Sequence, residues 1–461
     1  MSSDTSSAKP LSSGLNFQLS TMMFLQYAIW GAWLPLLWPF LSGHRGFTPA
    51  EIGNMFAIGA VGAIVAPFIA GQIADRWFNT EKFLGISHIL GGILVWQLAS
   101  LETYNSFLIF SLLYSLIYSP TLSLTNSLAF HHLPDRDRDF GKIRVWGTIG
   151  WIVVGIGIGQ WLLHQHTPTG VETEAVSAAQ AAGMADAFKL SGLLGIVMGI
   201  FCFFLPSTPP AKEEKKSAIG GALDAIRLQP LLTLFLIAVP ISCVHQFYFV
   251  HTAPFLGQFQ NQAEGFIDIV NKIVGVGGGG LMTIGQMAEI GVLALIPLFA
   301  KKYSRKALLC VGIAAYALRM FLFAYGPSFP ETLQLPAIIL GIAMHGLCFG
   351  CFIFVAFMVV DEECAADVRA SAQSLFNLVI VGIGIIVGSK VAGYVAEIST
   401  VDEVMNYQKL FSVPMWAALA CLVIMQLCYP NKPPATAADG PSDKDADLGT
   451  DPDTTPNNDD D

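Results

Sequence analysis

A glutamate inside an apolar run is the residue of this sequence best suited to chemistry. Glu289 lies near the middle of a run that begins at Gly278, and Gln286 precedes it by three residues, on the same face of a helix. A carboxyl group in such surroundings can bind a proton, because desolvation disfavours its charged form. Glu289 is therefore a candidate proton carrier. The alternative is a structural partner for a nearby Arg or Lys.

An arginine and a threonine form a second candidate pair. Arg144 and Thr148 lie four residues apart in IRVWGTIGW, and so on one face of a helix. A guanidinium there can hold a hydroxyl or carbonyl oxygen of a ligand, or pair with Glu289. The alternative is an arginine at a helix mouth whose side chain reaches the polar surface and sets topology.

Further polar side chains lie inside other apolar runs. His245 and Gln246 are adjacent in one run, and a buried histidine is more often a packing residue than a ligand. His345 and Phe349, four residues apart in another run, share a face on which a flat ligand can stack. Arg319 has no evident partner, and we expect it to form a structural ion pair.

Signatures of enzymes and of nucleotide-driven motors are absent from the sequence. It contains no P-loop G-x-x-x-x-G-K-[ST], no G-x-S-x-G and no H-E-x-x-H. The glycine run at 275–280 does not follow a predicted strand, which argues against a phosphate site. Of the eight cysteines, Cys348 and Cys351 read C-x-x-C, but they lie in an apolar run, where we expect them to be packing residues. We therefore expect no enzyme activity, no metal and no cofactor.

The composition places these residues in a membrane. Of the 461 residues, 53% are hydrophobic and only 13% are charged, whereas soluble proteins contain about 25% charged residues. The net charge is −10, but nine Asp and two Lys after residue 430 contribute −7 of it. No basic surface remains that would bind nucleic acid.

Twelve apolar runs are long enough to cross a bilayer, which takes about 20 residues in a helix. They begin near Phe17, Glu51, Phe83, Ser106, Val145, Ala187, Pro230, Gly278, Ala307, Leu333, Ala370 and Tyr407. The first and seventh runs contain Pro35 and Pro240, where we expect bends. The runs predict an all-α polytopic membrane protein with twelve transmembrane helices. Because the sequence has no nucleotide-binding motif, we expect an ion gradient as its energy source.

Loops rich in Lys and Arg alternate with loops that hold few of either. The rich loops include Arg76, Lys82, Arg136, Arg138, Lys142, Lys212, Lys215, Lys216, Arg227, Lys301, Lys302, Arg305, Lys306 and Arg369. Cytoplasmic loops carry this excess, so we expect both termini in the cytoplasm. The cluster Asp361, Glu362 and Glu363 ends a run on that side, and we expect it to pair with the basic loops.

A hydrophilic linker divides the runs into two sets of six. We assign 1–16 to a cytoplasmic N-terminal segment, 17–206 to an N-terminal half, 207–228 to the linker, 229–429 to a C-terminal half and 430–461 to a disordered acidic tail. The strings VGIGIG and VGIGII, at matching places in the two halves, are traces of a repeat. Two such halves with a site between them are typical of the major facilitator fold.

Several longer strings resemble the nucleoside:H⁺ symporter family of the major facilitator superfamily. They are LQYAIWGAWLPLL from Leu25, SPTLSLTNSLAFHHL from Ser119, IRVWGTIGW from Ile143, GQMAEI from Gly285, ALRMFLFAYG from Ala317 and VRASAQSLF from Val368. The resemblance runs over residues 15–429. It implies a carrier of the bacterial inner membrane that imports nucleosides with protons.

The resemblance also implies a nucleoside site, in which Gln and Arg groups bind ribose hydroxyls and the base edge while aromatic side chains stack on the base. The residues that match by type and spacing are Arg144, Thr148, Gln246, Gln286, Glu289 and Phe349. Three positions differ from the family pattern. Trp151 stands where a Phe is expected, His345 where a Tyr is expected, and Phe249 where an Asn is expected.

A fourth difference bears on proton coupling. Gly350 stands where the family pattern has a carboxylate implicated in coupling. Glu289 would then carry the proton alone or with help from His345, because an imidazole, with an ordinary pKa of about 6.5, suits proton transfer. We expect a monomeric importer, embedded in the lipid bilayer, that works by alternating access. The alternative is a carrier for a sugar or a nucleobase, with or without coupling.

Overall fold

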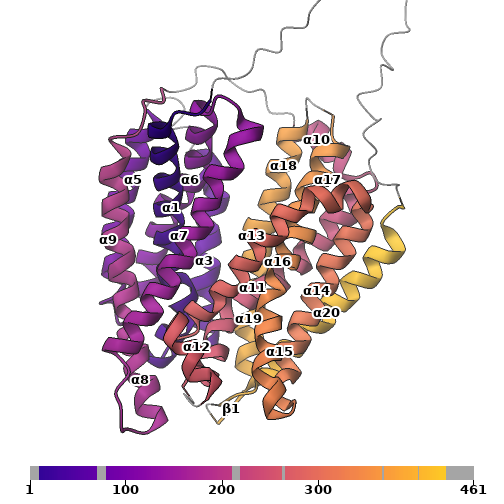
Figure 1. Ribbon diagram of the computed structural model, residues 1–461. Coiled ribbons are helices and arrows are strands. Elements are labelled where there is room, and N and C mark those ends of the chain that lie inside the picture. The colour runs from indigo at the N-terminus through magenta and orange to yellow at the C-terminus, as the bar shows by residue number, and fades with distance from the viewer. Residues whose placement is uncertain are drawn as a thin grey trace, which may run out of the picture.

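The computed structural model is an almost entirely helical bundle (Figure 1). It describes residues 10–69, 79–209, 219–261, 265–365, 368–402 and 404–431. Most of the predicted N-terminal segment, the centre of the predicted linker and nearly all of the predicted acidic tail lie outside the described residues. The same holds for four of the basic loop residues, Arg76, Lys212, Lys215 and Lys216.

The helices form two consecutive sets. The first set comprises α1 (Ser13–Trp33), η1 (Leu34–Leu36), α2 (Leu37–Gly43), α3 (Pro49–Ile69), α5 (Thr80–Leu98), α6 (Tyr104–His132), α7 (Arg136–Gln165), α8 (Thr173–Gly183) and α9 (Ala185–Cys202). The second begins with α10 (Ile219–Ile226), α11 (Leu231–Gln260), α12 (Phe266–Val274), α13 (Gly279–Lys302), α14 (Arg305–Tyr325) and η3 (Gly326–Ser328). It continues with α15 (Glu331–Ala343), α16 (His345–Leu347), η4 (Cys348–Phe354), α17 (Val355–Glu363), α18 (Arg369–Asn377), η5 (Leu378–Gly384), α19 (Ile385–Ser399) and α20 (Tyr407–Cys428). A two-stranded hairpin, β1 (Thr400–Val401) and β2 (Val404–Met405), joins α19 to α20.

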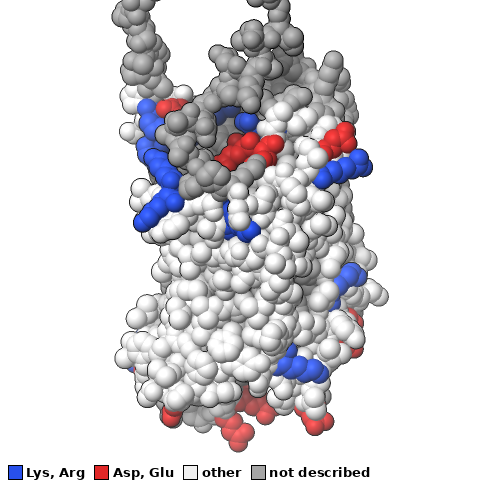
Figure 2. All heavy atoms as spheres, turned by 90° about the vertical axis from the view of Figure 1, so that its right-hand side faces the viewer, with Lys and Arg blue, Asp and Glu red and all other residues white. Residues whose placement is uncertain are grey.

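The described helices account for the twelve predicted spans. Eleven helical segments are long and apolar enough to cross a bilayer. The twelfth is α5, a helix of 19 residues that packs against α6 and α9 within the same bundle. Figure 2 shows that the middle of one face of the molecule is largely free of charged side chains, which gather toward its two ends. Such a surface suits contact with lipid hydrocarbon.

The two prolines behave differently. At Pro35 the helix tightens into the 3₁₀ turn η1, which separates α1 from α2, so the expected bend is present. At Pro240 the α-helix runs unbroken, because α11 extends from Leu231 to Gln260. The short helices α8 and α12 were not predicted, since neither is an apolar run of membrane-crossing length.

Two spans of the second half change helix type midway. The tenth span is divided after α15 and passes through the π-helical segment η4, and the eleventh passes through the π-helical segment η5. Segments of π-helix are rare and occur frequently at functional sites, because the extra residue per turn re-aims the neighbouring side chains. Phe349 lies within η4, and His345 lies three residues before its first residue.

The two halves are joined at the end of the molecule opposite the termini. There, the backbone N–H of Val276 donates to the carbonyl oxygen of Gly159 at 3.0 Å. Nε2 of Gln160 donates to the carbonyl of Lys272 at 3.0 Å, and Asn261 Nδ2 to Ser177 Oγ at 2.7 Å. Toward the other end, the ribbons of the two halves diverge (Figure 1).

Candidate functional site

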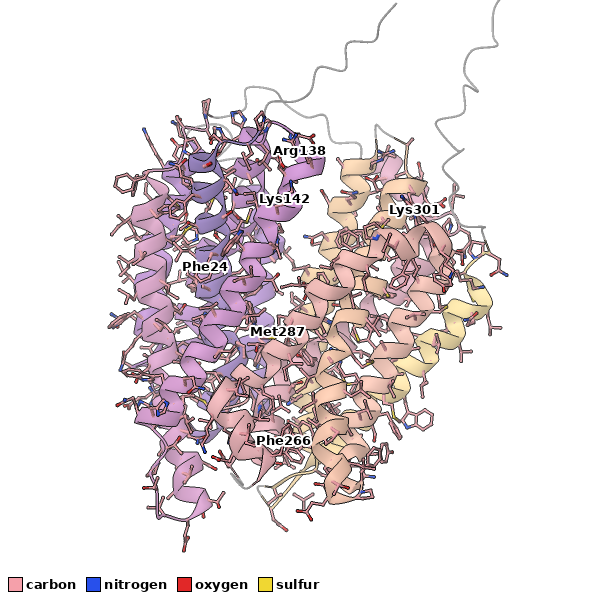
Figure 3. All side chains as sticks on the ribbon, in the orientation of Figure 1. Phe24, Arg138, Lys142, Phe266, Met287 and Lys301 are labelled. Atoms are coloured by element: carbon pink, nitrogen blue, oxygen red, sulfur yellow. The ribbon has the colours of Figure 1, made fainter. Side chains whose placement is uncertain are left out.

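The strongest candidate from the sequence, Glu289, contacts a histidine inside the second half. Its Oε2 lies 3.5 Å from Nε2 of His345, and the two side chains are 15% and 2% exposed. A Cβ at Gly346 would lie 2.5 Å from the carbonyl oxygen of Ala288, so this glycine allows α16 to approach α13 closely. In Figure 3, Met287 of α13 lies at mid-height of the molecule. Glu289 follows it by two residues in the same helix.

The expectation for Arg319 is wrong. Arg319 is fully buried, but among the described residues no carboxylate pairs with it. Its Nη1 lies 3.2 Å from Nδ1 of His345, and its guanidinium lies over the rings of Tyr248 and Tyr316, 4.3 and 5.0 Å from their centroids. Cation–π contacts therefore take the place of an ion pair, and Arg319 belongs to the cluster around His345.

A row of aromatic rings connects the two halves at this level. Trp151 lies edge-on to Trp30 at 6.2 Å within the first half, and edge-on to Phe249 of α11 at 6.5 Å across the interface. Phe249 in turn lies 6.0 Å from His345, which stacks on Tyr248 at 4.8 Å. Phe349 lies 6.5 Å from the same imidazole. Of these rings, Trp151, Phe249 and Phe349 are half-buried and can face a planar ligand, whereas Tyr248 and His345 are buried.

Arg144 is half-buried and lies over an aromatic ring of the first half. Its guanidinium lies 4.1 Å from the ring centroid of Tyr27 in α1, and it is near enough to Glu289 for the two charges to interact. This placement favours a functional role over a purely topological one. Thr148, one turn away, is half-buried, and the described residues show no hydrogen bond from it to the rest of the predicted site.

The two glutamines differ in their surroundings. Gln286 is buried, and its Oε1 has no hydrogen-bond partner within the described part of the chain. An unpaired buried amide oxygen costs about 1–3 kcal/mol, which a ligand donor could recover. Gln246 packs against Gly388 of α19, because a Cβ added at Gly388 would lie 2.9 Å from the Cβ of Gln246. The described contacts do not join Gln246 to Glu289 or Arg144.

Gly350 has a packing role. A Cβ at this position would lie 2.7 Å from Cγ1 of Val292 on α13. A carboxylate side chain at Gly350 would therefore require the Val292 side chain to shift.

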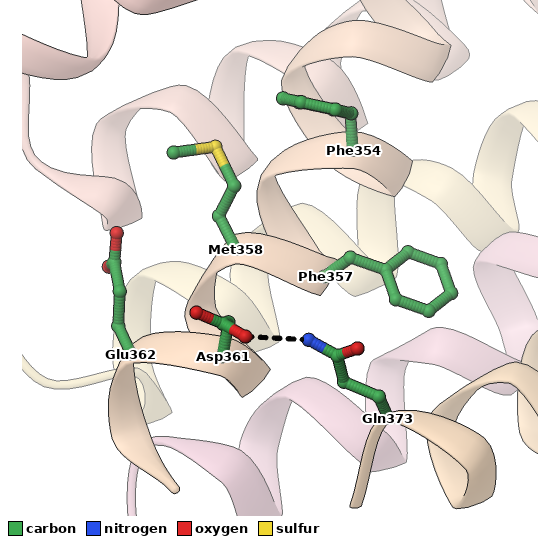
Figure 4. Close-up of a pocket in the computed structure, with 6 residues that line it drawn as sticks. All are labelled: Phe354, Phe357, Met358, Asp361, Glu362 and Gln373. Atoms are coloured by element: carbon green, nitrogen blue, oxygen red, sulfur yellow. Dashed lines mark hydrogen bonds between the residues drawn. The ribbon is translucent and has the colours of Figure 1, made fainter. Parts of the chain in front are cut away.

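The pocket drawn in Figure 4 is separate from the predicted site. It has a volume of about 290 Å³ and is lined by Phe354, Phe357, Met358, Asp361, Glu362 and Gln373. Gln373 Nε2 donates to Asp361 at 2.9 Å, and Arg305 binds the Glu362 carboxylate with its closest atoms at 2.7 Å. Arg369 lies 3.8 Å from Asp361. The expected pairing with basic residues is confirmed for Asp361 and Glu362.

Comparison with known proteins gives matches over most of the chain. The family described as "Nucleoside H+ symporter" matches residues 13–433. A putative nucleoside transporter of Escherichia coli, YegT, is 33% identical over 82% of this chain and 84% of its own length. The xanthosine permease of the same organism is 29% identical over 88% of this chain and 94% of its own length.

Solved structures show the same arrangement of helices. The crystal structure of the nucleoside transporter NupG aligns with a TM-score of 0.75 at 25% identity, covering 89% of this chain and 98% of that one. A D-xylose–proton symporter aligns with a TM-score of 0.63 at 14% identity, covering 92% of this chain and 100% of that one, which shows a shared fold alone. The twelve-helix major facilitator architecture expected from the sequence is confirmed.

Proposed function

Because this chain belongs to the nucleoside H⁺ symporter family, we propose that it imports nucleosides together with protons across the bacterial inner membrane. Its family and its relatives are transporters, so the chain is a multi-pass membrane transporter and not an enzyme. The observation that carries the proposal is the contact of Glu289 with His345 beside a row of aromatic rings. We further propose that it acts as a monomer with both termini in the cytoplasm.

The site suits a ligand that has a flat ring and several hydroxyl groups. Trp151 and Phe249, both half-buried, supply ring faces for a base. Arg144 and the unpaired Oε1 of Gln286 supply a donor and an acceptor for ribose hydroxyls or the base edge. A sugar would use the polar groups but leave the ring faces without a partner.

The proposed mechanism is alternating access. The hydrogen bonds between the halves hold the end opposite the termini together. With the termini in the cytoplasm, this arrangement is the one from which substrate leaves into the cell. Rocking of the halves then exposes the same site to the outside. Coupling requires that a proton on Glu289 change nucleoside affinity, and linkage makes the effect reciprocal.

Replacing Arg144 should weaken nucleoside binding. We expect Arg144→Leu to raise the KM for uptake by about 10- to 100-fold, because hydrogen bonds to a charged group are worth about 1.5–3 kcal/mol. Arg144→Lys should lie between the wild type and Arg144→Leu, since an ammonium keeps the charge but not the planar fork. Lys142→Gln is the matched control, because this exposed lysine pairs with Asp139. A wild-type KM in Arg144→Leu would restrict Arg144 to a topological role.

Competition tests the substrate class. Cells that lack their own nucleoside carriers and express this chain should take up radiolabelled uridine or adenosine in a saturable way. An excess of unlabelled nucleoside should abolish the uptake, whereas free ribose, glucose or uracil at the same concentration should leave most of it, because none presents both a base and a ribose. Transport of a sugar or nucleobase that nucleosides do not inhibit would favour the alternative carrier function instead.

A further inference from the structure

The two ring nitrogens of His345 have different partners. Nδ1 faces Nη1 of Arg319 at 3.2 Å, and Nε2 faces the carboxylate of Glu289 at 3.5 Å. A guanidinium in a protein stays protonated and only donates hydrogen bonds. Nδ1 must therefore be the acceptor of that bond, and it carries no hydrogen.

The hydrogen of the neutral imidazole consequently lies on Nε2, directed at Glu289. A second proton on the ring would have to bind Nδ1, where an N–H of Arg319 already points. It would also place a positive charge beside a guanidinium in a fully buried position. While Arg319 stays in place, His345 is a neutral donor and not a proton carrier.

Several side chains hold Arg319 in this position. Its guanidinium lies over the rings of both Tyr248 and Tyr316. The hydroxyl of Tyr316 lies 2.7 Å from Nδ1 of His245, which anchors that ring in turn. Within the described residues, Nε and Nη2 of Arg319 have no hydrogen-bond partner, so the contact with His345 is the hydrogen bond that orients the guanidinium.

Within the part of the chain that the structure describes, no other group forms a hydrogen bond with Nε2 of His345. From α11, Tyr248 stacks on the imidazole and His245 lies parallel to it at 5.6 Å. Phe249 and Phe349 present ring carbons. Arg144, from the first half, acts on Glu289 rather than on His345.

We propose that Arg319 is a positioning residue that keeps His345 as a neutral hydrogen-bond donor to Glu289, so that Glu289 alone takes up and releases the coupled proton. On uptake, an O–H bond forms on one carboxylate oxygen and the side chain changes from negative to neutral. On release, the same bond breaks and the proton leaves to water on the other side. The inference rests on the proposed proton-coupled function. With Gly350 in place of a carboxylate, the sequence left open whether His345 helps Glu289 to carry the proton, and the inference assigns the proton to Glu289.

The first test replaces the imidazole by a donor that cannot titrate. The amide of glutamine places an N–H close to the position of Nε2, so His345→Gln should still accumulate labelled nucleoside in proteoliposomes under a pH gradient, within about twofold of the wild-type ratio. Loss of accumulation in His345→Gln, with the wild type coupled, would overturn the inference. Absence of accumulation in the wild type as well would instead contradict the proposed function.

The second test releases Nδ1. In Arg319→Met, Nδ1 loses its donor and can accept a proton, so the pH profile of nucleoside exchange should gain a second ionisation. Arg319→Lys and the double variant Arg319→Met with His345→Gln should lack it. An Arg319→Met profile identical to that of the wild type would overturn the inference. If Arg319→Met does not reach the membrane, the accumulation by His345→Gln decides.

Discussion

Glu289→Gln should abolish uphill accumulation of nucleoside while it leaves exchange of nucleoside across the membrane. Glutamine has nearly the same size and keeps an oxygen that can face Nε2 of His345, but it cannot ionise. Coupling needs a site whose protonation changes substrate affinity. A gradient of one pH unit is worth 1.36 kcal/mol and supports about tenfold accumulation for one proton per nucleoside, whereas the variant should only equilibrate.

The measurement compares two assays on the same proteoliposomes. Accumulation under an imposed pH gradient reports coupling, and counterflow without a gradient reports binding and translocation. Glu397→Gln is the matched control, because Glu397 is an exposed carboxylate near the end of α19 and should leave both assays unchanged. Accumulation by Glu289→Gln at the wild-type ratio would assign the proton to another residue.

Gly275→Ala should slow transport much more than it weakens nucleoside binding. Gly275 has φ 79° and ψ −169°, a conformation that only glycine adopts readily. A Cβ on Gly275 would overlap the carbonyl carbon of Gly159. The oxygen of that carbonyl accepts the hydrogen bond from the Val276 N–H that joins the halves. Backbone strain of about 1–3 kcal/mol, added to this overlap, should destabilise the state in which the halves are joined at this end by about 3 kcal/mol or more. The uptake rate should fall by about 100-fold.

The chain offers a control that separates backbone strain from the contact between the halves. Gly170 has φ 78°, but a Cβ there would meet nothing within 4 Å. Gly170→Ala should therefore carry a similar strain and leave the uptake rate within about twofold of the wild type. Equal rates for Gly275→Ala and the wild type, with binding intact, would show that the halves do not close through this contact.

Local pattern was sufficient to predict the spans but not all elements of the fold. A run of about 20 apolar residues that crosses a bilayer has to form a helix, since its backbone groups find no other hydrogen-bond partners. Pro35 marks a helix break because it removes a backbone donor. The helices α8 and α12 are short and partly polar, so neither run length nor hydropathy reveals them. The π-helical segments η4 and η5 depend on packing between spans, which one segment of sequence does not encode.

For the site, the sequence revealed candidates but not their partners. Glu289 could be predicted, because an ionisable residue is rare at membrane depth. Its contact with His345 depends on the close approach of α13 and α16 that Gly346 permits. Arg319 was expected to form an ion pair and does not, because two of its contacts, Tyr248 and His345, come from α11 and α16, distant in sequence. One signal was available, since Tyr316 precedes Arg319 by three residues and so shares its helix face.

Accumulation of radiolabelled uridine or adenosine by proteoliposomes that contain the purified chain tests the central claim most directly. With an inwardly directed proton gradient, the account predicts saturable accumulation above the external concentration, and its collapse to equilibrium when a protonophore is added. Saturable accumulation that the protonophore does not change, or no uptake of either nucleoside by protein shown to be in the membrane, would contradict it.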